Sequence, residues 1–291
     1  MSAAAKHNQA LAAQAKTNEF ELSDRDFNNL RRLVSEHTGI SLSDQKRDLV
    51  YARLAKRLRV HGMTSFRAYC ELLEQDPGEE LEHFTNAITT NLTSFFREKH
   101  HFEFLQQDLV PMLLERYQKN RRLRIWSAGC STGEEPYSLA ITLREAIPDI
   151  DGRDIRILAT DLDSNVVKTG AAGVYQAERI NGLDSARIKR WFQRGKGGNQ
   201  GRVRVADELR KLITFRQLNL MHDWPMRGQF DVIFCRNVVI YFDKPTQQVL
   251  FDRFANIMQP DSYLFIGHSE TLHNVSERFQ LVGKTIYRRL R

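Results

Sequence analysis

The spacing of apolar residues in the middle of the chain predicts a strand, a turn and a helix in immediate succession. Leu123 to Ser127 is a short apolar run, which is typical of a buried strand. Gly129 to Gly133 supplies a turn without bulky side chains. Pro136 then falls in a first helical turn, where backbone N–H groups lack partners, and apolar residues recur at helical spacing at Leu139, Ala140, Leu143 and Ile147. Strand, glycine turn and helix together open a nucleotide-binding unit.

Strands and helices continue to alternate from residue 121 to residue 291, which predicts an α/β domain. Further strands are expected at 154–161, 212–219, the first part of 230–242, and 263–267, with a helix at 245–258. Such alternation favours a mostly parallel sheet with helices on both faces. The segments 279–282 and 285–290, joined by Gly283-Lys284, are expected to form an antiparallel hairpin. A parallel sheet with a reversed final strand fits a methyltransferase better than a dehydrogenase.

Residues 183–212 interrupt this alternation. A helix is expected at 184–192, followed by a glycine-rich basic turn and an alternating strand at 202–205. We therefore predict a small antiparallel β-subdomain inserted into the larger domain. Its basic hairpin fits either a flexible loop or a strand edge that accepts an extended peptide.

The first ninety residues have the pattern of a helical bundle. Residues 1–20 are expected to be a flexible tail, and residues 21–90 a helical domain with helices near 23–39, 43–60, 66–75 and 80–90. Ser23 is expected to cap the first helix, and Ser43 or Asp44 the second. Residues 91–120 form an interdomain segment and a helix, which places the larger domain at 121–291.

The second of these helices is unusually basic. It has six cations against only two acids, Asp44 and Asp48. Helical spacing places four of the cations on one face, at Lys46, Arg53, Lys56 and Arg57, with Arg59 close by. A charged face of this kind is either simply solvated or a docking surface for an acidic partner. The scarcity of acids within the helix favours docking.

Composition limits the class of protein. The chain has 291 residues, 41% of them hydrophobic, and residues 1–18 resemble neither a signal peptide nor a membrane span. We therefore expect a cytoplasmic protein without membrane insertion. The formal net charge of +7 suggests an acidic partner, which leaves nucleic acid, a membrane surface and an acidic helix open. Cys70, Cys130 and Cys235 are odd in number and far apart, and the sequence has no C-x-x-C or H-E-x-x-H motif. Neither a disulfide framework nor a zinc site is supported, so buried thiols and no metal are expected.

The ligand of the glycine turn is only partly determined by its residues. Gly129 and Gly133 lack the third glycine of a dinucleotide fingerprint, and no Lys-Ser or Lys-Thr pair follows for a P-loop. Glu134 and Glu135 would repel a pyrophosphate but suit a cationic, hydroxyl-bearing ligand such as S-adenosylmethionine. They would equally well complement the helix dipole. Asp161 ends the next strand, where such folds hold ribose hydroxyls, although capping of the following helix is the alternative; Asp163 or Ser164 is the expected cap.

Four stretches in their order and spacing resemble the chemotaxis receptor methyltransferases, the CheR family. They are TTNLTSFFRE at 89–98, WSAGCSTGEEPYS at 126–138, FCRNVVIYF at 234–242 and GHSE at 267–270. The resemblance implies a class I S-adenosylmethionine-dependent (Rossmann-like) methyltransferase domain behind an N-terminal helical domain. It further implies transfer of a methyl group to glutamate carboxylates on chemoreceptor signalling helices, forming glutamyl methyl esters and S-adenosylhomocysteine.

The resemblance also implies roles for particular residues. Cofactor contacts are expected at Asn91, Thr93, Arg97, Gly129, Glu135, Asp161, Asn219, Leu220, Arg236 and Asn237. Arg97 and Tyr241 resemble the residues that flank the reacting methyl group. The basic helix would then dock the receptor helix, through Lys46, Arg53, Lys56, Arg57 and Arg59. The projecting hairpin would be a candidate site for a receptor's C-terminal pentapeptide, and we expect a monomer.

Two alternatives from other classes stay open at this point. A nucleic-acid methyltransferase would use the positive charge, although the Asn-Pro-Pro-Tyr element for a flipped base is replaced by Arg236-Asn237-Val238-Val239. A non-catalytic scaffold would keep the fold and bind partners through the basic helix and hairpin. The sequence contains no obvious catalytic triad, and methylation of an ionised carboxylate requires none.

Overall fold

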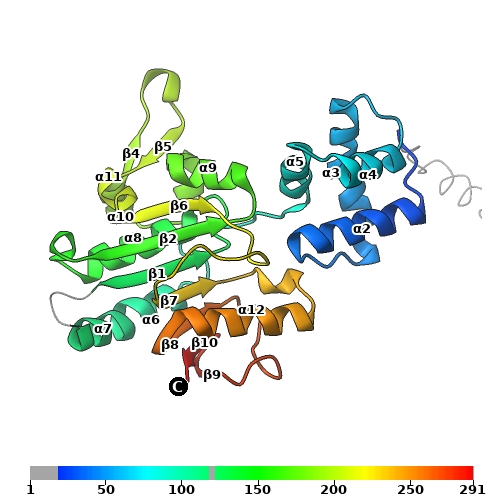
Figure 1. The fold of residues 1–291 in the computed structure, drawn as a ribbon. Helices are drawn as coiled ribbons and strands as arrows, with labels where there is room; N and C mark the ends of the chain where they lie inside the picture. Colours follow the sequence, from blue (N-terminus) through cyan, green and yellow to red (C-terminus); the bar gives the residue numbers. More distant parts are fainter. Residues whose placement is uncertain (1–18, 118–121, 291) are drawn as a thin grey trace, which may run out of the picture. The chain divides into compact units, whose positions relative to one another are not determined.

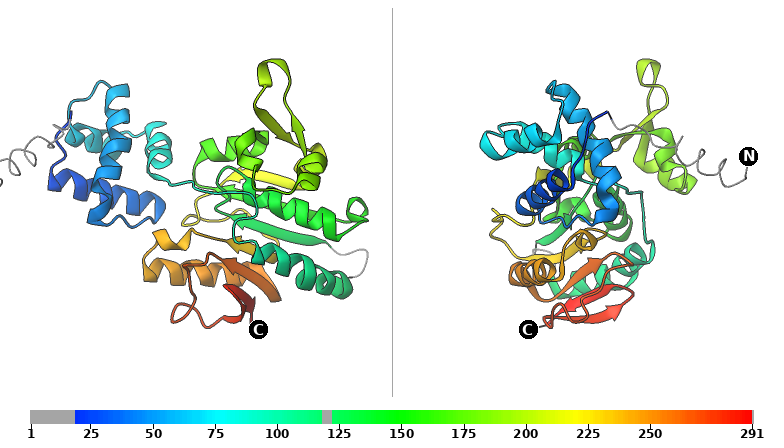
Figure 2. Two further views of the ribbon diagram at one scale, coloured as in Figure 1. Left: turned by 180° about the vertical axis from the view of Figure 1, so that it is seen from behind. Right: turned by 90° about the vertical axis from the view of Figure 1, so that its right-hand side faces the viewer.

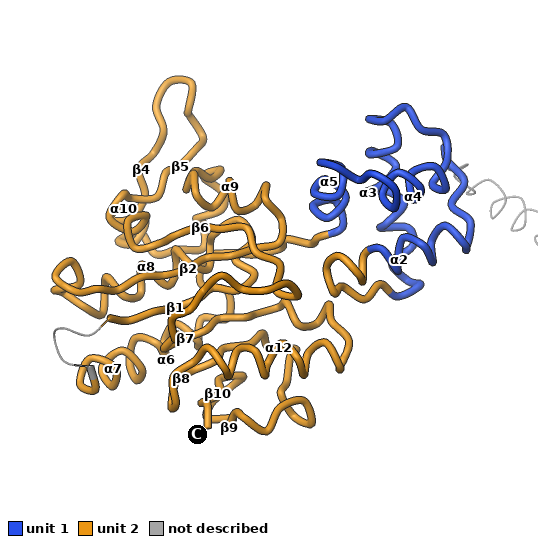
Figure 3. The backbone as a smooth tube through the Cα atoms, viewed as in Figure 1, with its two compact units in different colours: residues 1–33, 43–88 blue, residues 34–42, 89–291 orange. Residues whose placement is uncertain are grey.

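The computed structural model describes residues 19–117 and 122–290. The chain divides into two compact units, residues 1–33 with 43–88, and residues 34–42 with 89–291 (Figure 3). The tail predicted at residues 1–20 lies outside the described residues, apart from Glu19 and Phe20.

The first unit is helical. It contains the first part of α2 (Asp24–Thr38), a short 3₁₀ turn η1 (Asp44–Lys46), α3 (Arg47–Val60), α4 (Phe66–Gln75) and α5 (Glu80–Ile88). The apolar stripes that the sequence predicts form its core, which includes Phe27, Leu30, Val50, Leu54, Leu58, Phe66, Tyr69 and Phe84, all 3% exposed or less. The helical prediction for this region is therefore confirmed.

The two predicted helix caps in this region have opposite outcomes. Ser23 caps α2 in a reciprocal arrangement: Asp26 N donates to Ser23 Oγ at 3.2 Å, and Ser23 N donates to Asp26 Oδ2 at 3.3 Å. The prediction that Ser43 or Asp44 caps the second helix is wrong. The η1 turn comes first, so α3 begins at Arg47 behind Lys46, and the Ser43 side chain makes no capping hydrogen bond.

The second unit is built on a seven-stranded sheet with the order β6-β2-β1-β7-β8-β10-β9 (Figure 1). The strands are β1 (Leu123–Ala128), β2 (Ile155–Asp161), β6 (Ile213–Gln217), β7 (Phe230–Cys235), β8 (Met258–Ile266), β9 (Phe279–Gly283) and β10 (Ile286–Arg289). Pairing is parallel from β6 to β8, and β10 is antiparallel to both β8 and β9. The predicted parallel sheet with a reversed last strand is confirmed.

Helices bury both faces of the sheet, because successive residues of each strand point to opposite sides. Ile125 and Phe234 face a core with α8 (Glu134–Ala146) and the helix formed by α6 (His100–Phe104), η2 (Leu105–Leu109) and α7 (Val110–Tyr117). Trp126 and Ile233 face a second core with α12 (Lys244–Ile257). The helix predicted around Phe102 and Leu113 is therefore present, with a π-helical middle segment, η2.

A separate three-stranded antiparallel sheet has the order β3-β5-β4. It comprises β3 (Val174–Gln176), β4 (Phe192–Arg194) and β5 (Arg202–Val205), and α10 (Ser185–Trp191) precedes β4. Figure 2 shows the β4–β5 hairpin projecting from the sheet domain. The predicted antiparallel subdomain is confirmed, but it also uses β3, which lies before the expected start at residue 183. The short helices α9 (Ser164–Ala172) and α11 (Asp207–Arg210) complete the unit.

None of the helices in residues 19–117 and 122–290 is both long and apolar enough to cross a membrane.

Candidate active site

The parallel strands place most of the predicted cofactor contacts along one edge of the sheet. The carboxyl ends of β6, β2, β1 and β7 meet at this edge, because these strands run in the same direction. Residues there are Gly129 after β1, Asp161 at the end of β2, Asn219 and Leu220 after β6, and Arg236 and Asn237 after β7. In open α/β sheets this edge is where ligands bind. Residues spread over more than a hundred positions of sequence are thus brought together.

Gly129 allows a close approach at the end of β1. Its φ is +91°, and a Cβ atom built there would lie 2.3 Å from Cγ2 of Val238. Gly129 N donates to Thr160 O at 2.8 Å, which ties the turn to β2. A side chain at this position would therefore both strain the backbone and displace the loop after β7.

Asp161 holds the turn after β1 through its carboxylate. Oδ2 accepts from Ser131 N at 2.8 Å and Oδ1 accepts from Asp163 N at 3.0 Å. Burial raises the pKa of Asp161 to about 6, although these backbone hydrogen bonds oppose the rise. Each carboxylate oxygen has a further lone pair, so Asp161 can still accept from two ligand hydroxyls. Asp163 caps α9 by accepting from Asn165 N at 2.9 Å, as predicted.

Asn91 joins the interdomain segment to this carboxylate region. Its Nδ2 donates to Asp163 Oδ2 at 2.8 Å, and its carbonyl accepts from Ser131 Oγ at 2.9 Å. The segment is therefore fastened to the turns after β1 and β2. The neighbouring Thr93 is fastened elsewhere, since its carbonyl accepts from Arg179 Nη2 at 3.2 Å. Arg179 in turn pairs with the fully buried Glu134.

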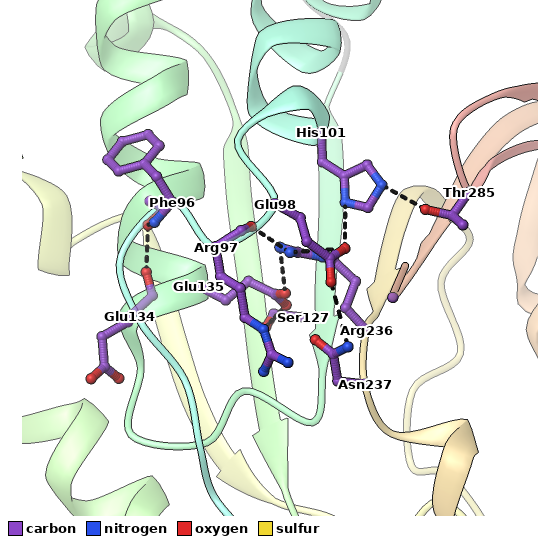
Figure 4. Close-up of polar contacts among 12 residues, drawn as sticks. Phe96, Arg97, Glu98, His101, Ser127, Glu134, Glu135, Arg236, Asn237 and Thr285 are labelled. Carbon is purple, nitrogen blue, oxygen red and sulfur yellow. Dashed lines mark hydrogen bonds and ion pairs between the residues drawn. The ribbon is translucent and has the colours of Figure 1, made fainter. Parts of the chain in front are cut away.

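Glu135 and Arg236 form a buried ion pair beneath the glycine turn (Figure 4). Arg236 Nη1 lies 3.2 Å from Glu135 Oε2, and Ser127 Oγ donates to Glu135 Oε1 at 2.7 Å. Burial raises the pKa of Glu135, while the charge of Arg236 and the Ser127 hydrogen bond oppose the rise. The sequence left a cofactor contact and a helix-dipole role open for Glu135. The structure adds that its carboxylate pairs with Arg236 and accepts from Ser127.

Glu98 is a member of the site that the sequence reasoning did not single out. Its Oε2 lies 3.3 Å from Arg236 Nη2, and its Oε1 accepts from His268 N at 3.2 Å and lies 2.8 Å from His268 Nδ1. Burial would raise its pKa, but His268 and the charge of Arg236 outweigh burial and lower the pKa to about 2. Glu98 is part of the motif TTNLTSFFRE, so the motif contained it, yet no local pattern indicated its partners.

His101 packs beside this pair as a structural group. It is fully buried, its Nε2 lies 3.0 Å from Thr285 Oγ1, and its ring stacks edge-on to Phe265. Burial lowers the pKa of His101 to about 3, so the ring is neutral at neutral pH. His268, by contrast, has an exposed side chain.

The backbone carbonyl and the side chain of Arg97 have different partners. The Arg97 carbonyl accepts a hydrogen bond from Arg236 Nη2, whereas its own Nη1 donates to Leu92 O at 2.9 Å. Figure 4 shows the guanidinium extending away from the buried Glu135–Arg236 pair. The Arg97 side chain is therefore not part of the buried ion pairs that Arg236 forms.

The loop after β7 carries Asn237 and Tyr241. Asn237 adopts a left-handed φ of 58°, and its Nδ2 lies 3.4 Å from Glu98 Oε1. Tyr241 ends the 3₁₀ turn η6 (Val239–Tyr241), and its carbonyl accepts from Ser41 N at 2.8 Å. The side chain of Tyr241 is partly exposed.

Asn219 and Leu220 shape the loop after β6. Asn219 Nδ2 donates to His37 O at 2.6 Å, and its Oδ1 accepts from Met221 N at 2.9 Å. Leu220 is 8% exposed, and its carbonyl accepts from Arg253 Nη1 at 2.6 Å. Both residues therefore fix the backbone at the edge where a nucleoside base would lie in this fold.

The residues along this edge fit S-adenosylmethionine. The carboxylate of Asp161 would accept from ribose hydroxyls, Glu135 would place negative charge near an ammonium group, and Arg236 would place positive charge near a carboxylate. The turn after β1, residues 129–133, contains no lysine or arginine of its own that would suit a pyrophosphate. In the part of the chain that the structure describes, no group of three or more His, Cys, Asp or Glu side chains is arranged to hold a metal ion. The three cysteines are buried and unpaired, as expected.

The basic helix α3 belongs to the first unit. Acidic side chains of that unit compensate more of its positive charge than the sequence suggested. Arg57 Nε donates to Glu80 Oε1 at 2.9 Å, and Arg59 Nε donates to Glu19 Oε2 at 3.0 Å. Arg53 Nη1 donates to the Ile88 carbonyl at 2.5 Å. Acids are scarce within the helix itself, as the sequence shows, but Glu80 and Glu19 from other segments of the unit compensate part of its charge. The scarcity of acids alone therefore supports docking less than the sequence suggested. Lys46 and Lys56 are exposed.

Sheet order, the reversed strand β10 and the strand-end carboxylate Asp161 together define a class I S-adenosylmethionine-dependent methyltransferase domain. Two family models match the chain: "CheR methyltransferase, all-alpha domain" over residues 25–89, and "CheR methyltransferase, SAM binding domain" over residues 91–288. The chain belongs to the CheR methyltransferase family.

Curated relatives match along most of their length. The chain is 47% identical over 270 residues to chemotaxis protein methyltransferase 2 of Pseudomonas aeruginosa, which covers 92% of this chain and 94% of that protein. It is 43% identical over 288 residues to the chemotaxis protein methyltransferase of Klebsiella aerogenes, covering 98% and 96%. It is 42% identical over 274 residues to that of Escherichia coli, covering 93% of each.

Proposed function

We propose that this enzyme methylates glutamate side chains of chemoreceptors, forming glutamyl methyl esters and S-adenosylhomocysteine as part of adaptation in bacterial chemotaxis. The observation that carries the proposal is the convergence of Asp161, Glu135 and Arg236 at the carboxyl edge of the sheet. Family membership supports receptor methylation over the nucleic-acid and scaffold alternatives.

The chain's own residues have limited chemical work to do in this reaction. S-adenosylmethionine, when bound, supplies an electrophilic methyl group on a sulfonium. The receptor glutamate is already ionised near pH 7, so no residue needs to remove a proton from it. The protein's contribution is to bind, orient and exclude water, which favours a reaction in which opposite charges are neutralised.

We assign the residues as follows. Asp161 accepts from the ribose hydroxyls, Glu135 and Arg236 bind the amino-acid end, and Asn219 and Leu220 shape the adenine side. The remaining contacts to the cofactor come from Asn91, Thr93, Gly129 and Asn237. Arg97 and Tyr241 flank the reacting methyl group, with Arg97 positioning the substrate carboxylate. The freedom of the Arg97 guanidinium from the buried ion pairs supports that role.

The decisive test is the chemistry of the product. Methyl-labelled S-adenosylmethionine is incubated with the protein and receptor cytoplasmic fragments, and the labelled product is treated with mild base. A methyl ester releases labelled methanol, whereas N-methylated lysine or arginine retains the label. Retention of the label in base contradicts the proposal.

The proposal also covers the oligomeric state of the enzyme, its location and a site for a receptor peptide. The enzyme acts as a cytoplasmic monomer, and the edge of strand β4 in the three-stranded sheet accepts a receptor's C-terminal pentapeptide. Strand β4 pairs with β5 alone among the described strands, which supports an available edge. Calorimetry with the pentapeptide tests this, and absence of heat at saturating peptide excludes tethering.

A further inference from the structure

Of the GHSE motif at residues 267–270, only His268 has appeared in the site, as a partner of Glu98, yet the glutamate of the motif is buried. Glu270 is 6% exposed. Its Oε2 accepts from Asn237 N at 3.0 Å and from Gly267 N, and its Oε1 accepts from Ile240 N at 3.3 Å. One carboxylate thus satisfies backbone N–H groups from both ends of the turn that follows β7.

That turn would otherwise be costly to maintain. Asn237 is a non-glycine residue with φ of 58°, a left-handed conformation that carries backbone strain which the surroundings must offset. The N–H groups of this turn also face a buried carboxylate rather than water, and a buried donor without an acceptor destabilises the fold. The Glu270 carboxylate accepts from these N–H groups and so also supports the left-handed backbone at Asn237.

The rest of the motif supports the same turn. A Cβ built on Gly267 would lie 2.4 Å from Asn237 Nδ2 and 2.8 Å from Asn237 N, so only glycine permits this approach. His268 binds Glu98, which also contacts Asn237 and Arg236. The loop after β8 therefore holds the loop after β7 from two sides.

The turn matters because of the residues it presents. Arg236 precedes it, Tyr241 follows in η6, and Val238 packs against Gly129 of the glycine turn. A shift of this backbone would therefore move Arg236, Asn237 and Tyr241 together, all of which are proposed to contact the cofactor or flank the methyl group.

We propose that Glu270 is a positioning residue for the methyl-transfer site, acting through the backbone of residues 237–240. It does not touch substrate or cofactor. This inference rests on the proposed function, since it concerns the placement of Arg236, Asn237 and Tyr241. Gln at this position keeps the size of the side chain but replaces one acceptor oxygen with a donor NH₂, so at least one of the three N–H groups loses its acceptor.

The chain offers a matched control in Asp231. This carboxylate is also buried, at 3% exposure, and accepts a backbone hydrogen bond from Arg124 N at 2.8 Å. It lies near the amino end of the same strand, β7, away from the cofactor edge. Asp231→Asn should therefore destabilise the fold without moving the turn.

The experiment compares Glu270→Gln with Asp231→Asn in the full chain. Binding of S-adenosylhomocysteine is measured by calorimetry, and amide hydrogen exchange at residues 237–240 is measured without cofactor, both well below each variant's Tm. For Glu270→Gln we expect about tenfold weaker binding, faster exchange at these amides, and a raised KM for S-adenosylmethionine with an unchanged KM for receptor. For Asp231→Asn we expect a lowered Tm with binding within twofold of wild type.

Three results would overturn the inference: wild-type affinity in Glu270→Gln, unchanged exchange at residues 237–240, or equal loss of affinity in Asp231→Asn. Should Glu270→Gln not fold, Glu270→Asp keeps the charge but shortens the reach, and binding less than threefold weaker than wild type would equally refute the idea. The proposed function is judged separately. If the wild-type protein binds S-adenosylhomocysteine and forms base-labile esters while Glu270→Gln behaves identically, only this inference fails; if the wild type binds no S-adenosylhomocysteine, both fail.

Discussion

Arg236 lies between two buried carboxylates, with Nη1 3.2 Å from Glu135 Oε2 and Nη2 3.3 Å from Glu98 Oε2. The guanidinium is 2% exposed, so removal of either charge leaves an uncompensated partner in a poorly solvated site. The two carboxylates come from different segments, Glu98 from the stretch before α6 and Glu135 from the start of α8. This arrangement makes the site sensitive to single substitutions.

Glu135→Gln should weaken binding of S-adenosylhomocysteine by at least tenfold and lower stability by about 1–3 kcal/mol, because a buried charged hydrogen bond is lost. Calorimetry and urea unfolding measure the two effects. Glu145→Gln on the same helix is the control, since Glu145 pairs with Arg187 at 2.7 Å and is not assigned to the site. Equal loss of affinity in both variants would mean that Glu135 acts only through stability.

Asp161 should make cofactor affinity depend on pH. Its pKa is raised to about 6 by burial, so the carboxylate becomes protonated as the pH falls below that value and loses capacity to accept from hydroxyls. We expect S-adenosylhomocysteine affinity to fall several-fold between pH 7 and pH 5. The contribution of Asp161 to folding stability has the opposite pH dependence. Because its pKa in the folded state exceeds the unfolded value near 3.9, this contribution decreases as the pH rises from about 4 to 6.

The control for this pH effect is Asp161→Asn, which should bind weakly at every pH with most of the slope gone. A slope that persists unchanged in the variant would assign the pH dependence to another group.

Arg97 and Tyr241 should affect turnover more than cofactor binding. If Arg97 positions the substrate carboxylate, Arg97→Ala should lower kcat about 100-fold, a size typical of lost orientation, and Tyr241→Phe about tenfold. S-adenosylhomocysteine affinity should change less than the turnover does. Tyr263→Phe, whose hydroxyl contacts Met112 Sδ at 3.8 Å, serves as the control and should leave kcat unchanged. Equal effects on kcat and on cofactor affinity would contradict a role beside the methyl group.

The receptor-docking proposal for α3 is best tested at its exposed lysines. Arg57 pairs with buried Glu80, so charge reversal there would disturb the fold as well as any docking. Lys46→Glu combined with Lys56→Glu should raise the receptor KM several-fold, while Tm and cofactor affinity stay constant, because the change removes attraction for an acidic helix. Reversal of the exposed Lys211, which directly follows α11, is the control. A receptor KM that does not respond to the double reversal, or that responds equally to Lys211→Glu, would argue against docking on this face.

Glu80 should determine the acid stability of the helical unit. It accepts from Arg57 Nε at 2.9 Å and from the Tyr69 hydroxyl at 2.6 Å, and lies 2.7 Å from His61 Nε2. Burial would raise its pKa, but these partners outweigh burial and lower the pKa to about 2. The stabilisation is therefore complete above pH 4.5 and is lost as the pH falls toward 2.

Glu80→Gln should accordingly cost about 2 kcal/mol at pH 7 and flatten the acid limb of the stability curve, as measured by urea unfolding between pH 7 and pH 3. Glu71→Gln removes an exposed pair with Arg67 and should change stability by about 0.5 kcal/mol or less. An acid limb as steep in Glu80→Gln as in the wild type would show that another group controls it.

Several features followed from local sequence because their causes are local. The apolar run at 123–127, the glycine turn and the period of Leu139 and Leu143 predicted β1 and α8, since alternation and helical period depend on neighbouring residues. The cap at Asp163 followed for the same reason, because a capping side chain reaches only a few residues along the chain. The expected cap at Ser43 was wrong because a 3₁₀ turn intervenes before α3.

By itself, the sequence determined the order and type of the elements, the class of sheet, and the family to which the strand-end motifs belong. Only the tertiary structure decided which charges meet: Glu98 and Glu135 with Arg236, Glu80 with Arg57, and Glu270 with the turn at residues 237–240. These partners are separated by 23 to 138 positions. The energy of each pair depends on how much water is excluded around it, and that exclusion exists only when distant segments pack together.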